Sequence, residues 1–470
     1  VVGCSNGPPQ IISVVVDPTP EVNVVNVPPL TICNNGNVNI QISTPTTANN
    51  AADLSFDLSV SSTNIPMTAG TAFSTLSNQP FPRTLNGTLT NASSNVITVT
   101  FTITPKLNGC TSGLPVSTTV EVEPTPQVNL TNNTVTVCNN GVVNIGVASA
   151  TVPTIPGNLE FDVSVSSSNP AATGGTSFTS LSGQSFPATI GGTLTNSSTN
   201  VVTVTYSFTP KLNGCANGTV QTTTVQVQPV PQAIINNSTP VICNGSNVGI
   251  QITSPTIPSV PANLTFDVGV TSTGPIGGTA AGNLSNQPFP LTIGGTLTNT
   301  NNTFVTVTYT VTPKLNGCAN GVQQVTTVIV EPTPQAIVVN NDPTVCNGGT
   351  PDIDITAAST PNTPANLTFE VSVALPSGVT GTGVAASGIT SAAAPFSVDA
   401  GTLTNSSNSA KTVVYSITPK LTSCSNGPVQ TVNIVVEPTP QASFVNNLPK
   451  VCNNGTPNIT VTSSTASSVA

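Results

Sequence analysis

Apolar and polar residues alternate with a period of two along many short segments of this chain. In 159–165 every second residue is Leu, Phe or Val, and Glu, Asp and Ser stand between them. The segments 202–208 and 225–227 alternate in the same way. An extended segment with one apolar face is typical of a half-buried antiparallel strand. No segment shows the apolar spacing of a helix, so we predict an all-β fold.

Turn-forming residues separate the predicted strands. The sequences GG at 191–192, NSSTN at 196–200 and NGCANG at 213–218 consist largely of Gly, Asn and Ser, the residue types that turns require. The 43 prolines and 37 glycines fall mostly between the apolar runs. About seven strands recur in each stretch of about 105 residues, which predicts an Ig-like Greek-key β-sandwich.

The chain repeats itself with a period near 105 residues. Proline-rich linkers recur at that period, and a TPKL segment precedes each later linker. The cysteines also follow it in two series, which are Cys4, Cys110, Cys215, Cys318 and Cys424, and Cys33, Cys138, Cys243, Cys346 and Cys452. This period is too long for a solenoid and has the size of a sandwich domain, so we predict a tandem array.

The linkers place the expected domain boundaries. We predict Ig-like repeats 1 to 4 at 18–123, 124–228, 229–331 and 332–437, the last strand of a truncated repeat at 1–17, and the first strands of another at 438–470. We expect the natural protein to be longer than this sequence. Pro-x-Pro linkers stay extended and are short, so we expect the sandwiches to stack end to end as a rod of about 150 Å, since each strand is about 35–40 Å long.

Charge and composition exclude several classes of function. Seven basic residues against 16 acidic ones give a net charge of −9, so no basic face for nucleic acid can form. No segment is long and apolar enough to cross a bilayer, and we expect no membrane insertion. The chain contains no His, which a Ser-His-Asp triad requires. Because the few acids repeat with the period, we expect no enzyme, no catalytic residue and no cofactor.

Three motifs in fixed order resemble a known group of repeats. VCNNG precedes an apolar strand, YSFTPKLNGCANG ends another, and TTTVQVQP leads into Pro-x-Pro. Over the whole chain, these motifs resemble the PKD-like or Ig-like repeats of large Bacteroidota extracellular surface proteins. The resemblance implies a secreted, cell-surface or filamentous protein, often with a type IX secretion or gliding-associated sorting domain. No such domain lies in this sequence.

The cysteines are expected to form disulfides in an oxidising compartment. In an Ig-like unit, the cysteine after strand F lies at one end of the sandwich and the cysteine before strand B at the other. We therefore predict disulfides across the junctions between repeats: Cys33–Cys215, Cys138–Cys318 and Cys243–Cys424. Pairing within repeats remains open (Cys33–Cys110, Cys138–Cys215, Cys243–Cys318 and Cys346–Cys424), as do reduced or intermolecular cysteines. A metal site is not expected, because CxxC and His are both missing.

Each repeat also carries one recurring pair of opposite charges. Strands C and F are neighbours in the predicted topology, so we expect cross-strand ion pairs between Asp57 and Lys106, Asp162 and Lys211, Asp267 and Lys314, and Glu370 and Lys420. An intramolecular isopeptide bond is the alternative. Calcium at the junctions is a further alternative, but each junction offers one or two carboxylates, such as Glu121 and Glu123, and one junction has Gln226 and Gln228 instead.

These observations favour a structural, non-catalytic protein that forms the shaft of an extracellular filament or giant adhesin. The outward positions of the predicted strands are mostly Thr, Ser, Asn and Gln, and edge strands lack the charges that usually prevent pairing. Lateral self-association into a multi-chain fibre is therefore expected, with a cell-surface or substratum ligand as a further partner. Carbohydrate-binding modules are the alternative, although the few aromatic residues stand at inward positions.

Overall fold

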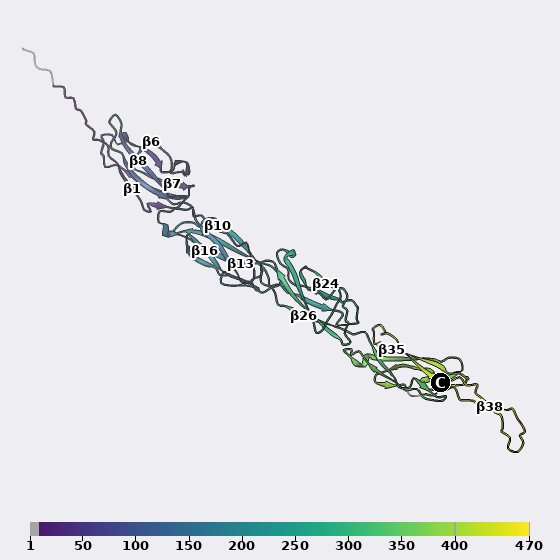
Figure 1. Ribbon diagram of the computed structural model, residues 1–470. Coiled ribbons are helices and arrows are strands. Elements are labelled where there is room, and N and C mark those ends of the chain that lie inside the picture. Colours follow the sequence, from purple (N-terminus) through teal and green to yellow (C-terminus); the bar gives the residue numbers. More distant parts are fainter. Residues whose placement is uncertain (1–8, 399–400, 470) are drawn as a thin grey trace, which may run out of the picture. The chain divides into compact units, whose positions relative to one another are not determined.

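The structure is a computed structural model that describes residues 9–398 and 401–469. The chain divides into two compact units, Val1–Val230 and Pro231–Ala470. Figure 1 shows both units built from strands, and the described residues contain a single α-helix, α1 (Val384–Ser387). Short 3-10 turns occupy η1 (Ala51–Asp53), η2 (Ile65–Met67), η3 (Pro156–Asn158), η4 (Pro261–Asn263) and η5 (Pro364–Asn366). The all-β prediction is confirmed.

The first unit contains two sandwiches with the same strand order. Repeat 1 has a four-stranded sheet, β1-β3-β7-β5, that packs on a five-stranded sheet, β2-β9-β8-β4-β6. Its strands are β1 (Asn23–Asn26), β2 (Thr31–Ile32), β3 (Gly36–Ser43), β4 (Leu54–Ser62), β5 (Thr68–Ala69), β6 (Leu76–Pro80), β7 (Arg83–Asn91), β8 (Ile97–Leu107) and β9 (Val116–Val122).

Repeat 2 follows the same plan, with sheets β10-β12-β16-β14 and β11-β18-β17-β13-β15. The domain boundaries between the repeats stay predictions. Its strands are β10 (Asn129–Asn132), β11 (Thr136–Val137), β12 (Gly141–Ala148), β13 (Leu159–Ser167), β14 (Thr173–Gly174), β15 (Leu181–Ser185), β16 (Ala188–Asn196), β17 (Val202–Leu212) and β18 (Gln221–Val227).

The second unit keeps the five-stranded sheet and has a shorter partner sheet. Repeat 3 comprises β19 (Ile234–Asn237), β20 (Val241–Ile242), β21 (Ile250–Thr253), β22 (Leu264–Ser272), β23 (Leu284–Pro288), β24 (Leu291–Ile293), β25 (Val305–Leu315) and β26 (Gln324–Val330). Repeat 4 comprises β27 (Ala336–Asn340), β28 (Thr344–Val345), β29 (Ile353–Ala357), β30 (Leu367–Ala374), β31 (Val379–Gly381), β32 (Ile389–Ala392), β33 (Phe396–Ser397), β34 (Leu403–Asn405), β35 (Lys411–Leu421) and β36 (Gln430–Val436). The strands β37 (Ser443–Asn446) and β38 (Ile459–Thr462) then form an antiparallel pair.

Repeats 1 and 2 each contain nine strands, not about seven. The additional strands arise because the first strand is split and because short strands such as β5 join the sheet edges. In repeat 2, the first half of the split strand, β10, pairs antiparallel with β12, and the second half, β11, pairs parallel with β18. At the break, the Oδ1 atom of Asn132 accepts a hydrogen bond from the backbone N–H of Thr134 at 2.9 Å, a local turn that competes with the sheet ladder.

The core of each repeat lies between its two sheets. In β17 the inward residues Val202, Val204, Tyr206 and Phe208 are fully buried, and the threonines between them are half-buried. The predicted alternation along 202–208 is therefore confirmed. In β13, Leu159, Phe161 and Val163 are also buried, while Val165 is half-buried.

Residues 9–17 form no strand, although a last strand was expected at 1–17. The expected strand corresponds to β9, which pairs antiparallel with β8 over its full length. No described residue before β1 supplies such a partner strand. Ile11, Ile12, Val14 and Val16 are consequently exposed. Residues 1–8, which include Cys4, lie outside the described residues.

Candidate functional site: the junctions between repeats

The CNNG sequence turns the chain sharply and exposes its cysteine at one end of the sandwich. Cys33 directly follows β2, and Asn35 has a φ of 68°, a left-handed conformation that asparagine tolerates better than most residues. The N–H of Gly36 donates to the carbonyl of Cys33 at 2.8 Å, closing the turn. The Oδ1 atom of Asn34 accepts the N–H of Asn91 at 2.8 Å. The cysteine is therefore held by β3 and β7 rather than by a free loop.

The NGCANG sequence places the second cysteine at the opposite end of its own repeat. Gly214 has a φ of 79°, and the N–H of Cys215 donates to the carbonyl of Leu212, the last residue of β17, at 2.9 Å. At Gly218 an added Cβ would lie 1.8 Å from the carbonyl oxygen of Pro126 in the linker. Only glycine allows this close approach, which packs the turn after β17 onto the proline linker.

Two disulfides join consecutive repeats within the units. Cys33 of repeat 1 is bonded to Cys215 of repeat 2, with a Cα–Cα distance of 5.5 Å. Cys243 of repeat 3 is bonded to Cys424 of repeat 4, also with a Cα–Cα distance of 5.5 Å. The structure therefore forms two of the three predicted junction pairs.

The other cysteines fall into three groups. Cys110, Cys346 and Cys452 are exposed free thiols, so the structure forms neither the Cys33–Cys110 nor the Cys346–Cys424 bond of the within-repeat alternative. The predicted Cys138–Cys318 pair would join the two units and stays a prediction. Cys4 lies outside the described residues. A cysteine before strand B cannot easily reach the cysteine after strand F of its own repeat, because the two lie at opposite ends of the sandwich.

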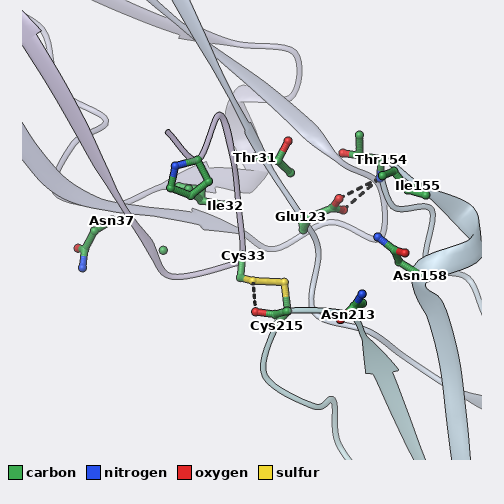
Figure 2. A pocket seen from close by; sticks show the side chains of 13 residues that line it. Thr31, Ile32, Cys33, Asn37, Glu123, Thr154, Ile155, Asn158, Asn213 and Cys215 are labelled. Carbon is green, nitrogen blue, oxygen red and sulfur yellow. Dashed lines mark hydrogen bonds between the residues drawn. A yellow bond between two sulfur atoms is a disulfide. The ribbon is translucent and has the colours of Figure 1, made fainter. Parts of the chain in front are cut away.

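A buried carboxylate ties the same repeats together a second time. Glu123 ends the last strand region of repeat 1 and is only 8% exposed. Its Oε1 and Oε2 atoms accept the backbone N–H of Thr154 of repeat 2 at 3.1 and 3.2 Å. Figure 2 shows this contact beside the Cys33–Cys215 disulfide. In unit 2, Glu331 accepts the N–H of Asn362 at 2.9 Å.

A short β-bridge forms the third contact between the repeats. The N–H of Val152 donates to the carbonyl of Ser94 at 2.8 Å, and the N–H of Val96 donates to the carbonyl of Val152 at 3.0 Å. In unit 2, Thr360 makes the equivalent pair with Asn302 and Phe304 at 2.7 and 3.1 Å. Each of these two junctions thus combines a covalent bond, a carboxylate–amide contact and a β-bridge.

The calcium alternative receives no support from this arrangement. The carboxylate of Glu123 already accepts a backbone N–H, and the corresponding linker position carries a buried Gln228, which can accept a hydrogen bond but adds no charge. Calcium requires six or more oxygen ligands and usually several carboxylates. Across residues 9–398 and 401–469, no group of three or more Cys, Asp or Glu side chains could hold a metal ion.

A pocket of about 570 Å³ opens at the first junction. Its walls come from both repeats (Figure 2) and include Ile32, Asn37, Ile155, Asn158 and Asn213. Its sulfur atoms belong to the Cys33–Cys215 disulfide, so they are not nucleophilic thiolates. The Glu123 carboxylate in its wall accepts the backbone N–H of Thr154, and the lining asparagine amides are neither nucleophiles nor bases.

The predicted ion pairs lie on the outer face of each five-stranded sheet. The Lys314 ammonium lies 2.7 Å from Asp267 Oδ2, and about a third of each side chain is exposed. Equivalent pairs join Lys106 to Asp57, Lys211 to Asp162 and Lys420 to Glu370. Four separate ammonium–carboxylate contacts occupy the positions considered for isopeptide bonds. Such exposed pairs contribute little to stability.

A backbone N–H assists each aspartate in these pairs. Asp57 Oδ1 accepts the N–H of Asn78 at 2.9 Å, and Asp162 Oδ1 accepts the N–H of Gly183 at 2.9 Å. The hydrogen bond from Lys106, followed by that from Asn78, lowers the pKa of Asp57. The hydrogen bonds from Lys211 and Gly183 lower the pKa of Asp162 in the same way. These carboxylates therefore stay ionised in the folded chain at neutral pH.

A buried asparagine in each repeat escaped the sequence analysis. Asn196 is 2% exposed, and its Nδ2 donates to the carbonyls of Asn200 and Val227 at 2.8 and 2.9 Å. Its Oδ1 accepts the N–H of Ser198 at 2.9 Å. Asn91, Asn299 and Asn405 make the corresponding contacts. The recurrence of LTN at the repeat period was the signal available in the sequence.

Comparison with known proteins does not assign the chain to a family. No protein-family model matches the chain, and no curated protein matches it. Solved structures with a similar fold include FdeC, an Escherichia coli adhesin, at 14% identity over 68% of this chain and 100% of that chain, with a TM-score of 0.30. The ICAM-5 D1–D4 ectodomain fragment is similar at 12% identity over 88% of this chain and 97% of that one, with a TM-score of 0.31.

A third similar structure contains the N-terminal eight Ig domains of DSCAM. It is 9% identical over 89% of this chain and 49% of that chain, with a TM-score of 0.27. The chain consists of Ig-like β-sandwich repeats. This follows from the strand order of its own sheets. In the described part of the chain, no helix is both long enough and apolar enough to cross a membrane.

Proposed function

We propose that this chain is a structural, non-catalytic segment of an extracellular fibre or giant adhesin, in which the repeats form a shaft. The observation that carries the proposal is the threefold connection between consecutive repeats by a disulfide, a buried carboxylate contact and a β-bridge. Independent domains on a flexible string need no such contacts, because domains in one chain are usually joined by mobile linkers.

Disulfides also support an extracellular location, since they persist in oxidising compartments. The motifs that resemble Bacteroidota surface repeats support the same location. Recurring groups such as the buried Asn196 stabilise individual repeats, which is the role expected of residues present in every unit. We therefore infer that the chain bears load or displays other domains and performs no chemistry.

Lateral association of several chains is part of this proposal. Four of the seven basic residues are neutralised by ion pairs within their own repeats. Apart from the paired Lys211, the outward positions of β17 are threonine and serine. Faces with so little charge repel one another weakly, which allows shafts to pack side by side.

Electron microscopy of the native particle tests this function. The proposal predicts uniform fibres wider than a single sandwich. Thin, isolated chains at high protein concentration would reject lateral association, and a flexible string of separate domains would reject the shaft. Binding to a glycan panel is the matched test of the carbohydrate-binding alternative, and the shaft role predicts no selective glycan binding.

A further inference from the structure

The two disulfides close very long loops of the chain. Cys33 and Cys215 are separated by 182 residues, and the loop between them contains every strand from β3 to β17. Cys243 and Cys424 are separated by 181 residues, and this loop contains every strand from β21 to β35. Each loop thus encloses most of the core strands of two consecutive repeats.

A pulling force on the ends of the chain follows the shortest covalent path between them. That path passes from Cys33 directly to Cys215, continues along residues 216–242, and passes from Cys243 directly to Cys424. Residues 34–214 and 244–423 lie off the path. We infer that the inter-repeat disulfides divert tension around the sandwich cores, so that the oxidised chain bears load through cystine bonds and short connecting segments.

The elements that remain on the path are the first and last strands of repeats. Between the loops these are β18, β19 and β20. Strands β19 and β20 stand at sheet edges and are held by four and two residue pairs, respectively. Force can peel such edge strands with little loss of buried surface. The central strands β17 and β25 have no covalent load to bear.

The junction contacts lie inside the loops and share this protection. Glu123, Thr154, Ser94 and Val152 all fall between Cys33 and Cys215 in the sequence. The carboxylate–amide contact and the β-bridge between repeats 1 and 2 are therefore kept while the chain is under tension. In an array without these disulfides, the hydrogen bonds between repeats would break first under force, and the disulfides keep tension away from them. The biological use of this device rests on the proposed shaft function, but the mechanical property does not.

Force spectroscopy of the full chain, attached by peptide tags at both ends, tests the inference. At about 3.4 Å per extended residue, reducing the chain with a dithiol should release about 1,200 Å of additional length from the two loops. Cys33→Ser alone should release roughly 500 to 600 Å in non-reducing buffer on the same basis, with the lower value expected if Cys138 is bonded to Cys318. Cys110→Ser, which removes an exposed free thiol, is the matched control and should release nothing.

Two results would overturn the inference. If Cys110→Ser lengthens the chain as much as Cys33→Ser, the disulfides lie within repeats and the cores of adjacent repeats are not bypassed together. If reduction leaves the maximal length unchanged, no disulfide shields the chain. A different result would reject the proposed function. If the chain lengthens as expected but its native particles are not fibres, the shaft role is rejected and the mechanical inference is supported.

Discussion

The two sheets of each sandwich differ in how strictly they are repeated. Strands β8, β17, β25 and β35 are 11 residues long in all four repeats, and each lies inside a five-stranded sheet. The facing sheet has four strands in repeats 1 and 2, three in repeat 3, and two separate groups of three and two in repeat 4. The invariant sheet provides most of the aromatic core and leads into the linker at its last strand.

Backbone geometry and packing explain the difference. Strand β24 ends at Ile293, and Gly295 follows with a φ of 102°, whereas β16 of repeat 2 continues through Gly192 with a φ of 111°. Residues other than glycine avoid this conformation. In contrast, β25 carries a buried apolar residue at every second position. A sheet held by buried side chains at every second residue tolerates little change, whereas a strand that contains such a glycine ends there in repeat 3 and continues in repeat 2.

The largest effect is expected from truncating the aromatic core of the invariant sheet. Phe161 is fully buried in β13, and its ring centroid lies 4.8 Å from that of Phe186. Phe161→Ala should cost about 3–5 kcal/mol, measured as lost hydrogen-exchange protection of β17 by mass spectrometry. Ile190→Val, on the facing sheet, should cost only about 0.5–1.5 kcal/mol.

Val142→Ala is the control for these two variants, because Val142 is 62% exposed on the facing sheet and should leave exchange unchanged. Equal losses for Phe161→Ala and Ile190→Val would contradict the expected ranking of these two costs.

The next largest effect concerns the link between the sheets. Asn196 belongs to β16, yet it donates a hydrogen bond to the carbonyl of Val227 in β18 on the opposite sheet. Asn196→Ala removes the side-chain donor to the buried carbonyl of Val227 and should cost about 2–3 kcal/mol. The free energy of opening repeat 2, obtained from hydrogen exchange, measures the loss, and Asn144→Ala at an exposed position of β12 should be neutral. A neutral Asn196→Ala would show that the two sheets do not depend on this contact.

A smaller effect should distinguish repeat 2 from repeat 4. The hydroxyl of Tyr206 lies 2.9 Å from Ser177 Oγ, while the buried hydroxyl of Tyr415 has no partner among the described residues. Tyr206→Phe should cost about 1 kcal/mol, and Tyr415→Phe should be neutral or stabilising. Burial raises the pKa of Tyr415 to about 12, so ultraviolet titration should show late ionisation of this residue. Equal costs for the two substitutions would reveal an unrecognised partner of Tyr415.

The smallest effect is expected from the exposed ion pairs. The hydrogen bond from Lys211 lowers the pKa of Asp162. The pair therefore stabilises the fold fully above the ordinary aspartate pKa and loses this contribution as the pH falls through the lowered pKa of the folded chain. Asp162→Asn should cost less than about 1 kcal/mol at neutral pH and nothing in strong acid. Urea denaturation at both pH values measures the difference, with Ser164→Ala as the control. A cost that persists in acid would exclude the ion pair as its cause.

The sequence predicted the features that depend on local pattern and on period. Alternation along 202–208 predicted β17. The period of the cysteines, combined with the place of each cysteine in the expected topology, predicted the Cys33–Cys215 bond. The role of Glu123 was not predicted, because its acceptor function depends on where the N–H of Thr154 lies. The burial of Asn196 was missed for the same reason, since its partner Val227 is distant in the sequence and no local pattern reports the contact.

The split first strand bears on how such an array changes in length. Because β2 runs parallel to β9 at the edge of the same sheet, the chain enters and leaves that sheet in the same direction. The same parallel pairing recurs for β11 with β18 and for β28 with β36. If the gene segment that encodes one repeat were duplicated or deleted, the chain would therefore still enter each neighbouring repeat at the same sheet edge and in the same direction. Genetic recombination could lengthen or shorten the protein by whole modules without requiring any new fold.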